Sequence, residues 1–591
     1  MPGRAIQKPT EGTSMLDYVI RNGLVVDGTG APGRRADVGL RDGRIVAVGP
    51  VEETARRELD ADGLVVAPGI IDPHTHYDAQ LFWDPSASPS NLHGVTTVIG
   101  GNCGFTLAPI KGEDHDYIRR MMAKVEGMPL VALEGGLAWD WTTFGDYLGR
   151  LEGNLGVNAG FLVGHCALRR WVMGSERAAE VASDEELAAM VQLLAESIEA
   201  GGLGFSSSQS RTNSDGDGNP ISSRHADRRE MLAFCEVVRD HPGTTLEYIT
   251  DGCLDTFSDA EIELMVAMTT TAQRPLNWNL LTVDSRTPDT TARQLEASAR
   301  AAATGGRIVA LTMPTLVPMN MSFRTHCALF LIPGWGDVMG LPIAERIEKL
   351  SDPVVRKQLD ELAHSEGAGV FRRLSHWANY IIGDTFAPEN DQLRWRDVGS
   401  IASEQGKPPF DALLDLVIAD DLRTVLWPKA SDGDDASWQA RVDVWNDPGA
   451  MVGGSDAGAH LDRMCGSNYP TSFLGDCLRK RKLVPLERAI QLMTEAPAVL
   501  FGLRDRGLVV EGRRADLFVF DPETVGSEPA TLVNDLPGGS PRLVAEATGV
   551  VRVLVNGVET IEDGRPTGNL PGTLLRSGRD TDTVEPAPAR A

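Results

Sequence analysis

The segment VVAPGIIDPHTHYD (residues 65–78) decides the fold. A short run of apolar, β-branched residues leads into the pair His74 and His76. Side chains two residues apart on a strand project to the same side, so both imidazoles are expected to point the same way. Two neutral imidazoles side by side suit a divalent transition metal. The segment therefore predicts a buried strand that carries a metal site at its carboxyl end.

Segments typical of strands and helices alternate on both sides of this point, from about residue 68 to residue 503. The apolar runs are PGIIDPHTH, GVTTVIGGN, VNAGFLVGH, GGLGFSSS, TTLEYIT, PLNWNLL, RIVALTM and AMVGGSD. Helical periodicity fills several gaps, most clearly in SDEELAAMVQLLAESIEAG, where Ser183 and Glu186 predict a capping box. Such alternation indicates an α/β fold with a parallel sheet. Eight units favour a closed (β/α)8 TIM-type barrel over an open sheet.

The two ends of the chain resemble each other in pattern. Alternating apolar and polar residues flank four turn signals, Asn22-Gly23, Asp42-Gly43, Asn556-Gly557 and Asp563-Gly564. Such dipeptides between alternating runs predict tight hairpins. We therefore expect residues 15–67 and 504–570 to form one small β-sandwich domain. Residues 1–14 and 571–591 are polar and are expected to be disordered tails.

One gap in the alternation is far longer than the others. It spans residues 315–449, between the seventh and eighth predicted strands. Structureless loops of this length are rare in compact domains, so the gap predicts a helical insertion lying over the barrel mouth. A lid or substrate-specificity element and a purely structural elaboration are both open interpretations.

The composition limits the classes of function. With 42% hydrophobic and 24% charged residues, the chain is typical of a soluble globular protein. No apolar run reaches the roughly 20 residues of a membrane helix, and the polar start lacks the apolar core of a secretory signal. A cytoplasmic location without a membrane partner is therefore expected. The net charge of -27 argues against a nucleic-acid partner. The cysteines lack paired spacing and are expected to be free thiols.

Two further residues at predicted strand ends fit the same metal site. Asp456, in GGSDAGAH after the eighth run, could complete the metal shell and accept a proton from metal-activated water. A helix N-cap before Ala457 is the alternative. Cys103, in GGNCGF after the second run, could supply a soft thiolate ligand. A small buried apolar residue is the alternative for Cys103.

The third and fourth runs end in residues suited to contact a substrate. His165, in VGHCALRR, could polarise a substrate carbonyl or bind the metal, and a structural histidine beneath the site is the alternative. The segment GFSSSQSRTNSDGDGNP offers hydroxyl, amide and guanidinium groups on Ser207, Gln209 and Arg211. We predict these three as substrate contacts, and an ordinary polar turn is equally open.

Taken together, these motifs resemble the amidohydrolase superfamily and, within it, the N-acyl-D-amino-acid deacylase group. VIRNGLVVDGTG and RADLFVFDP are common across the superfamily, whereas the cysteine of GGNCG and the segment VGHCALR indicate the deacylase branch. The resemblance implies a barrel with a small β-sandwich and a metal-dependent hydrolase of non-peptide carbon–nitrogen bonds. It also implies one or two divalent ions, zinc first, a small-molecule amide substrate and a homo-oligomer. The metal-site residues implied are His74, His76, Cys103 and Asp456.

The chain departs from the deacylases at two strand ends. Those enzymes place a metal-binding histidine at the end of the fifth strand and another at the sixth. The matching segments here, TTLEYITDG and RPLNWNLLTV, contain none. Glu247 is expected to replace an imidazole as an oxygen ligand, and Asn279, a poor zinc ligand, to hydrogen-bond in the site or to substrate. A single ion bound through His74, His76 and Asp456 then becomes the expectation, with Cys103 and Glu247 open.

Three functions remain open from the sequence. The first is an N-acyl-(D-)amino-acid deacylase, and the second is a cyclic-amide or lactone hydrolase or a deaminase on the same scaffold. The third is a metal-free binding or assembly protein, which the missing histidines favour. The presence together of the two histidines, Cys103 and Asp456 favours catalysis, and the fold alone cannot rank the substrates.

Overall fold

Each of the eight apolar runs forms a strand in the computed structural model, which describes residues 15–325 and 327–586. The strands pair in parallel as β6-β7-β8 and as β9-β10-β11-β12-β13-β16, and β9 continues β8 after Leu162. Every strand residue except Ala450 is buried, as expected where helices cover a parallel sheet. The bounds are β6 (Ile70–Asp72), β7 (Val95–Gly100), β8 (Asn158–Phe161), β9 (Val163–Gly164), β10 (Gly204–Ser208), β11 (Thr245–Ile249), β12 (Leu276–Trp278), β13 (Ile308–Thr312) and β16 (Ala450–Val452).

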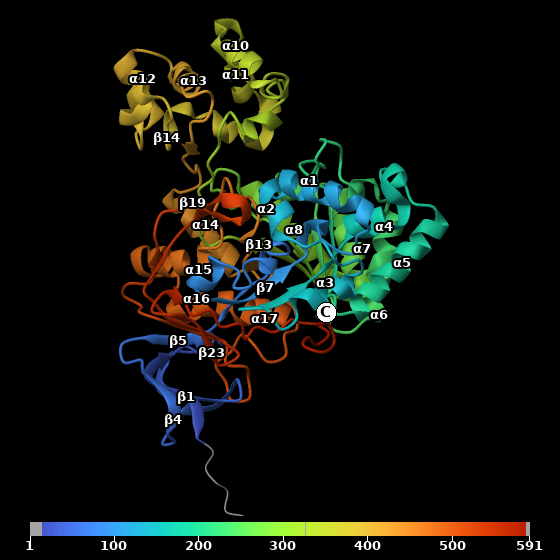
Figure 1. Cartoon of the computed structure of the whole chain (residues 1–591), viewed down its shortest axis with the longest axis vertical. Helices are drawn as coiled ribbons and strands as arrows, with labels where there is room; N and C mark the ends of the chain where they lie inside the picture. Colours follow the sequence, from blue (N-terminus) through green and yellow to red (C-terminus); the bar gives the residue numbers. More distant parts are fainter. Residues whose placement is uncertain (1–14, 326, 587–591) are drawn as a thin grey trace, which may run out of the picture.

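Helices follow these strands and pack around them (Figure 1). The helices α4 to α8 contact one another in chain order, as consecutive crossovers of a parallel sheet do. No helix among the described residues is both long and apolar enough to span a membrane. The helices are α1 (His115–Val125), α2 (Leu130–Gly136), α3 (Phe144–Leu151), α4 (His165–Arg177), α5 (Asp184–Glu199), α6 (Arg228–Asp240), α7 (Asp259–Ala272), α8 (Pro288–Ala303), α14 (Asp435–Trp445), α15 (Tyr469–Ser472), α16 (Leu486–Met493) and α17 (Glu495–Leu500).

Helix α5 begins at the predicted capping box. Ser183 Oγ accepts from the backbone N–H of Glu186 at 3.2 Å, and Glu186 Oε2 accepts from the backbone N–H of Ser183 at 2.8 Å. We expect Ser183→Ala to lower the free energy of unfolding by about 1 kcal/mol, because it removes one acceptor for the first-turn N–H groups. Denaturant titration followed by circular dichroism measures this loss. Ser175→Ala, at another exposed serine, is the control, and equal midpoints for both variants would contradict the assignment.

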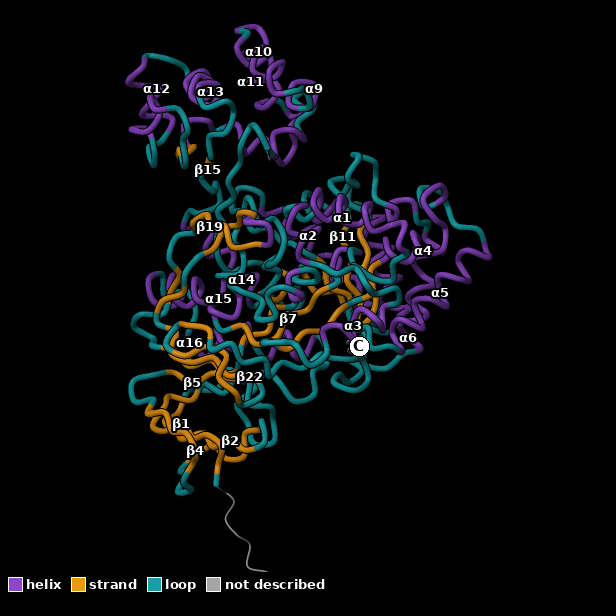
Figure 2. The backbone as a smooth tube through the Cα atoms, in the orientation of Figure 1, coloured by secondary structure: helices purple, strands orange, loops and turns teal. Residues whose placement is uncertain are grey.

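Strands from both ends of the chain form one sheet beside the parallel strands (Figure 2). Its order is β24-β23-β22-β17-β5-β1-β2-β3, with β4 paired to β1. The predicted small β-domain built from both termini is therefore confirmed. The last residues of β5 lead directly into β6, so this sheet anchors the strand that carries the histidine pair. The bounds are β1 (Leu16–Val25), β2 (Arg34–Arg41), β3 (Arg44–Gly49), β4 (Ala55–Asp60), β5 (Val65–Pro68), β17 (Leu517–Phe520), β22 (Val550–Val555), β23 (Val558–Glu562) and β24 (Arg565–Pro566).

Three of the four predicted tight hairpins are confirmed. They lie at Asp42-Gly43, Asn556-Gly557 and Asp563-Gly564, where both turn residues have positive φ. The prediction for Asn22-Gly23 is wrong, because this dipeptide lies inside β1 at a register shift opposite β2. Of the two residues, only Asn22 has a positive φ. A β-bulge can contain one residue in this conformation, so the strand continues through the dipeptide without a turn.

The long insertion forms a lobe with its own apolar core, which includes Trp335, Trp377 and Phe410. Figure 1 shows the lobe standing off from the rest of the molecule, so a role as a lid remains a prediction. At its base Met321 pairs with Leu426. The elements of the lobe are α9 (Gly336–Met339), α10 (Ile343–Ser351), α11 (Pro353–His364), β14 (Tyr380–Ile382), α12 (Val398–Gln405), α13 (Pro409–Ala419) and β15 (Leu426–Pro428).

The segment 571–586 differs from the expected disordered tail. Leu574 and Leu575 are buried, and Leu575 N–H donates to Ala159 O at 2.7 Å beside the start of β8. Two adjacent leucines bury enough apolar surface to hold an otherwise polar segment against β8. The other expected tail residues, 1–14 and 587–591, lie outside the described part of the chain.

Candidate metal centre

His74 and His76 extend from the carboxyl end of β6 on backbone that is held from both sides. Thr75 N–H donates to Ile99 O at 2.9 Å, and His76 N–H donates to Ala457 O at 2.7 Å. The side chain of Thr75 bonds to Ile99 O, on the side away from the imidazoles. Both histidines are buried. Both rings turn Nε2 toward Cys103, so they are presented on one side, as predicted from their spacing.

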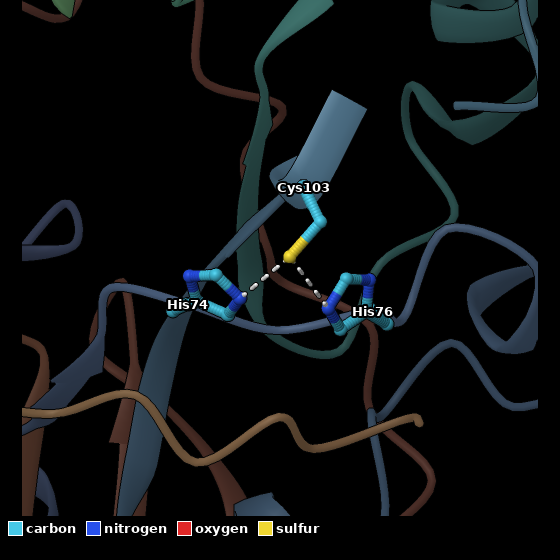
Figure 3. Close-up of side chains that lie close together, drawn as sticks. All are labelled: His74, His76 and Cys103. Carbon is cyan, nitrogen blue, oxygen red and sulfur yellow. Dashed lines mark hydrogen bonds between the residues drawn. The ribbon is translucent and has the colours of Figure 1, made fainter. Parts of the chain in front are cut away.

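Cys103 reaches the two histidines from the turn that follows β7. Its Sγ lies 3.4 Å from His74 Nε2 and 3.9 Å from His76 Nε2 (Figure 3). The turn requires glycine at position 101, where a Cβ would stand 2.2 Å from Leu162 O. Cys103 itself has φ +56°, a strained conformation of the kind that clusters at functional sites. Among the described residues, these three form the one such group whose potential ligand atoms all lie within 4.8 Å.

Asp456, in the loop after β16, also lies close to the two histidines. Its Oδ1 lies 3.1 Å from His74 Nε2 and 3.8 Å from His76 Nε2. Burial would raise the pKa of this carboxyl, but the hydrogen bond with His74 and the neighbouring imidazoles lower it to about 2. Asp456 is therefore an ionised carboxylate. No helix begins at Ala457 in the described chain, so the alternative N-cap interpretation is wrong.

Glu247 and Asn279, at the two strand ends without histidine, both contact this group. Glu247 Oε2 accepts from Cys103 N–H at 2.9 Å, while its buried Oε1 has no hydrogen-bond partner among the described residues. Asn279 Nδ2 donates to Asp456 Oδ1 at 3.0 Å. The expectation that these residues lie nearest the site agrees with these contacts.

Glu126 and His460 also belong to the site, although no motif singled them out as functional. Glu126 follows α1, and its Oε1 lies 3.5 Å from His76 Nδ1. His460 N–H donates to Glu126 O, and the buried His460 Nδ1 has no hydrogen-bond partner in the described chain. His460 is the last residue of the segment GGSDAGAH, shortly after Asp456, so the sequence could have indicated it as a site residue. Glu126 had none, because its place depends on packing between distant segments.

The donor set fits a divalent cation. Burial lowers the pKa of His76 to about 3, so its imidazole is neutral and offers a lone pair. Burial also raises the pKa of Glu126 and Glu247 well above the usual range, and neighbouring carboxylates raise both further. A cation among these groups would offset the cost of burying them. Nitrogen, sulfur and carboxylate oxygen donors together suit a metal such as zinc.

His165, predicted to polarise a substrate carbonyl or to bind the metal, lies in a buried hydrogen-bond network. Its Nδ1 is 2.8 Å from Ser207 Oγ, and its Nε2 is 2.7 Å from Glu230 Oε1. Arg169 in turn binds Glu230 at 2.6 Å. Both ring nitrogens are therefore engaged within the fold, which favours the structural alternative, and a catalytic or ligating role stays a prediction. Ser207, predicted to contact substrate, is buried in the same network, because both faces of β10 are covered.

Gln209 and Arg211 make local contacts after β10. Gln209 Nε2 donates to Ala226 O at 2.9 Å, and its Oε1 accepts from Tyr248 Oη at 2.6 Å. Exposed Arg211 pairs loosely with Asp251, at 3.9 Å. No hydrogen bond or ion pair in the described chain joins either residue to the metal-centre residues. Their predicted substrate contacts stay predictions.

Known proteins resemble this chain over most of its length. The amidohydrolase family model matches residues 57–565, and that of the urease alpha-subunit N-terminal domain matches residues 2–70. The D-aminoacylase of Alcaligenes xylosoxydans xylosoxydans is 30% identical over 567 residues, which cover 95% of this chain and 97% of that protein. The N-acyl-D-aspartate deacylase of the same organism is 28% identical over 574 residues, 96% of each chain.

A solved D-aminoacylase structure, reported for the functional role of its binuclear metal centre, superimposes with a TM-score of 0.62. It is 27% identical, and the match covers 95% of this chain and 100% of that one. The predicted enzyme class, a hydrolase of carbon–nitrogen bonds outside peptides, is confirmed. The chain belongs to the amidohydrolase family, in its D-aminoacylase-like group.

Proposed function

We propose that this chain is a metal-dependent deacylase of N-acyl-D-amino acids. The observation that carries the proposal is the convergence of His74, His76, Cys103 and Asp456 at the carboxyl ends of three barrel strands. Full-length relatives named for deacylation of D-amino acids support the substrate class. The cytoplasmic location and homo-oligomeric state expected from the sequence remain proposals.

The residues divide the chemical work between holding a cation and moving a proton. His74 and His76 would hold a divalent ion, with zinc the first candidate, through Nε2, together with Cys103. When bound, the ion supplies Lewis acidity toward the amide carbonyl and lowers the pKa of the attacking water. Asp456 accepts the proton of that water as oxygen attacks the carbonyl carbon. It then returns the proton to the nitrogen as the C–N bond breaks, which yields a carboxylate and a free amine.

Asn279 orients the proton carrier. Its donated hydrogen bond holds Oδ1 of Asp456, which leaves Oδ2 of the same carboxylate as the acceptor for the water proton. The low pKa of Asp456 keeps its carboxylate unprotonated, so that it is free to accept the proton of the water.

We propose one catalytic ion per chain. The fifth and sixth strands end in Glu247 and Asn279 instead of imidazoles, and an amide is a weak ligand for zinc-like ions. Glu247 holds the backbone of Cys103, so it positions one ligand and can offer its other oxygen to the same ion.

We also propose that the eight strands close into a barrel. Leu203 N–H donates to Phe161 O at 2.8 Å across the β8–β10 junction, and Thr75 pairs in parallel with Ala457 between β6 and β16. The domain bounds that we propose are residues 15–67 with 504–570 for the β-domain and 68–503 for the barrel. The insertion would occupy 315–449.

Metal analysis followed by a substrate panel tests the function. We expect elemental mass spectrometry to find close to one divalent ion per chain. We also expect release of free amine from N-acetyl-D-amino acids, with the L enantiomers as matched controls. Hydantoins and lactones belong in the same panel. Metal-loaded protein that opens only a cyclic substrate would replace the deacylase proposal, and protein that takes up no metal on reconstitution would overturn it.

A further inference from the structure

Glu126 touches two separate parts of the metal centre. Its carboxylate lies 3.5 Å from His76 Nδ1, and its backbone oxygen accepts from the backbone N–H of His460. The side chains of Glu126 and His76 are 3% and 2% exposed, so water does not compete for this contact. Glu126 thus lies between the segment that follows β6 and the loop that follows β16, although it comes from the end of α1.

The two ring nitrogens of His76 face different partners. Nε2 faces Cys103 Sγ and Asp456 Oδ1, at 3.9 Å and 3.8 Å. Nδ1 points the other way, and within the described chain the Glu126 carboxylate is the one acidic group within 4 Å of it. A neutral imidazole that offers Nε2 to a metal carries its proton on Nδ1, and that buried N–H requires an acceptor.

We propose that Glu126 is a positioning residue for the metal centre: its carboxylate orients His76 through Nδ1, while its backbone oxygen fixes the loop that carries Asp456. This inference rests on the proposed function. A carboxylate behind a ligating histidine fixes the tautomer and ring orientation and makes the imidazole a stronger ligand.

The surroundings of Glu126 favour this role over a purely structural one. The carboxylate caps no helix, and among the described residues its one close side-chain partner is His76, whose Nδ1 makes no other hydrogen bond. Burying a carboxyl group without a partner costs free energy, so packing alone would favour an apolar side chain here. Gly127, which follows, has φ +60°, and a Cβ there would stand 3.2 Å from His460 Cα. The backbone therefore brings α1 directly against the loop that follows Asp456.

Zinc affinity of the full-length protein tests the proposal, measured by competition with a chromophoric chelator on metal-free protein. We expect Glu126→Ala to weaken zinc binding by about 10–100-fold, the usual effect of removing such a partner. Glu126→Gln retains an oxygen acceptor for Nδ1 and is expected to lose less. Glu134→Gln, at an exposed glutamate of α2, is the matched control and is expected to bind zinc like the unmodified chain.

Two further readouts separate positioning from folding. The thermal midpoint of the metal-free protein should be kept or raised in Glu126→Ala, because a buried polar carboxyl group is removed. The visible spectrum of the cobalt-substituted protein should change in Glu126→Ala and not in Glu134→Gln, since it reports the arrangement of ligands. Unchanged zinc affinity in Glu126→Ala, with or without a lower midpoint, would overturn the inference. Failure of the unmodified chain to bind zinc or cobalt would instead overturn the proposed function.

Discussion

Replacing Asp456 by asparagine is expected to lower kcat/KM by about 10²–10⁴-fold while the protein remains folded, the range typical of a lost general acid–base group. Asparagine keeps the shape of the side chain and an oxygen facing His74, at 3.1 Å in the present structure. It cannot accept a proton from water. Because the pKa of Asp456 is about 2, the native group is ionised at any ordinary assay pH, so the loss should appear across the whole pH range.

Steady-state kinetics on an N-acyl-D-amino acid that the unmodified enzyme cleaves measures this effect. Circular dichroism and metal content must be compared in parallel, so that a failure to fold or to bind metal is recognised. Asp443→Asn, an exposed position on α14, is the matched control and should keep full activity. A rate for Asp456→Asn within a few-fold of the control would exclude Asp456 as the proton carrier.

The strands and the first metal ligands could be predicted because short-range rules determine them. Strands buried on both faces read as continuous apolar runs, and their alternation with helical segments indicates a parallel sheet. In such a sheet all carboxyl ends meet at one edge, so His74, Cys103 and Asp456 were expected together. The structure places His74 Nε2 3.4 Å from Cys103 Sγ and 3.1 Å from Asp456 Oδ1.

The remaining parts of the site depend on information that is not local. Ser206, Ser207 and Ser208 are all buried on β10, so burial pattern alone cannot say which of them faces a substrate. His165 looked available because its partner Glu230 lies on another helix, far along the chain. Glu126 reaches His76 only because the end of α1 packs against the loop after β16. Each of these contacts joins segments that lie far apart in the sequence, and no periodic pattern in the sequence predicts that they meet.

Replacing His74 by alanine is expected to weaken metal binding by more than the roughly 10–100-fold loss expected for an outer partner such as Glu126. His74 Nε2 lies 3.4 Å from Cys103 Sγ and 3.1 Å from Asp456 Oδ1, so its removal takes a ligand from the centre of the group. It also removes the hydrogen bond that helps to keep the Asp456 carboxyl ionised. Turnover should fall to background with it.

Elemental mass spectrometry of purified His74→Ala, with zinc affinity measured as for the Glu126 variants, checks this expectation. His364→Ala, a half-exposed histidine of the insertion lobe, is the matched control and should retain the full metal content. A site built as described requires a fixed order of zinc affinity: the unmodified chain binds most tightly, Glu126→Ala less tightly and His74→Ala least. Unchanged metal content in His74→Ala would remove it from the ligand set. An equal loss in the two variants would mean that Glu126 contributes as much to metal binding as a direct ligand, rather than acting only through His76.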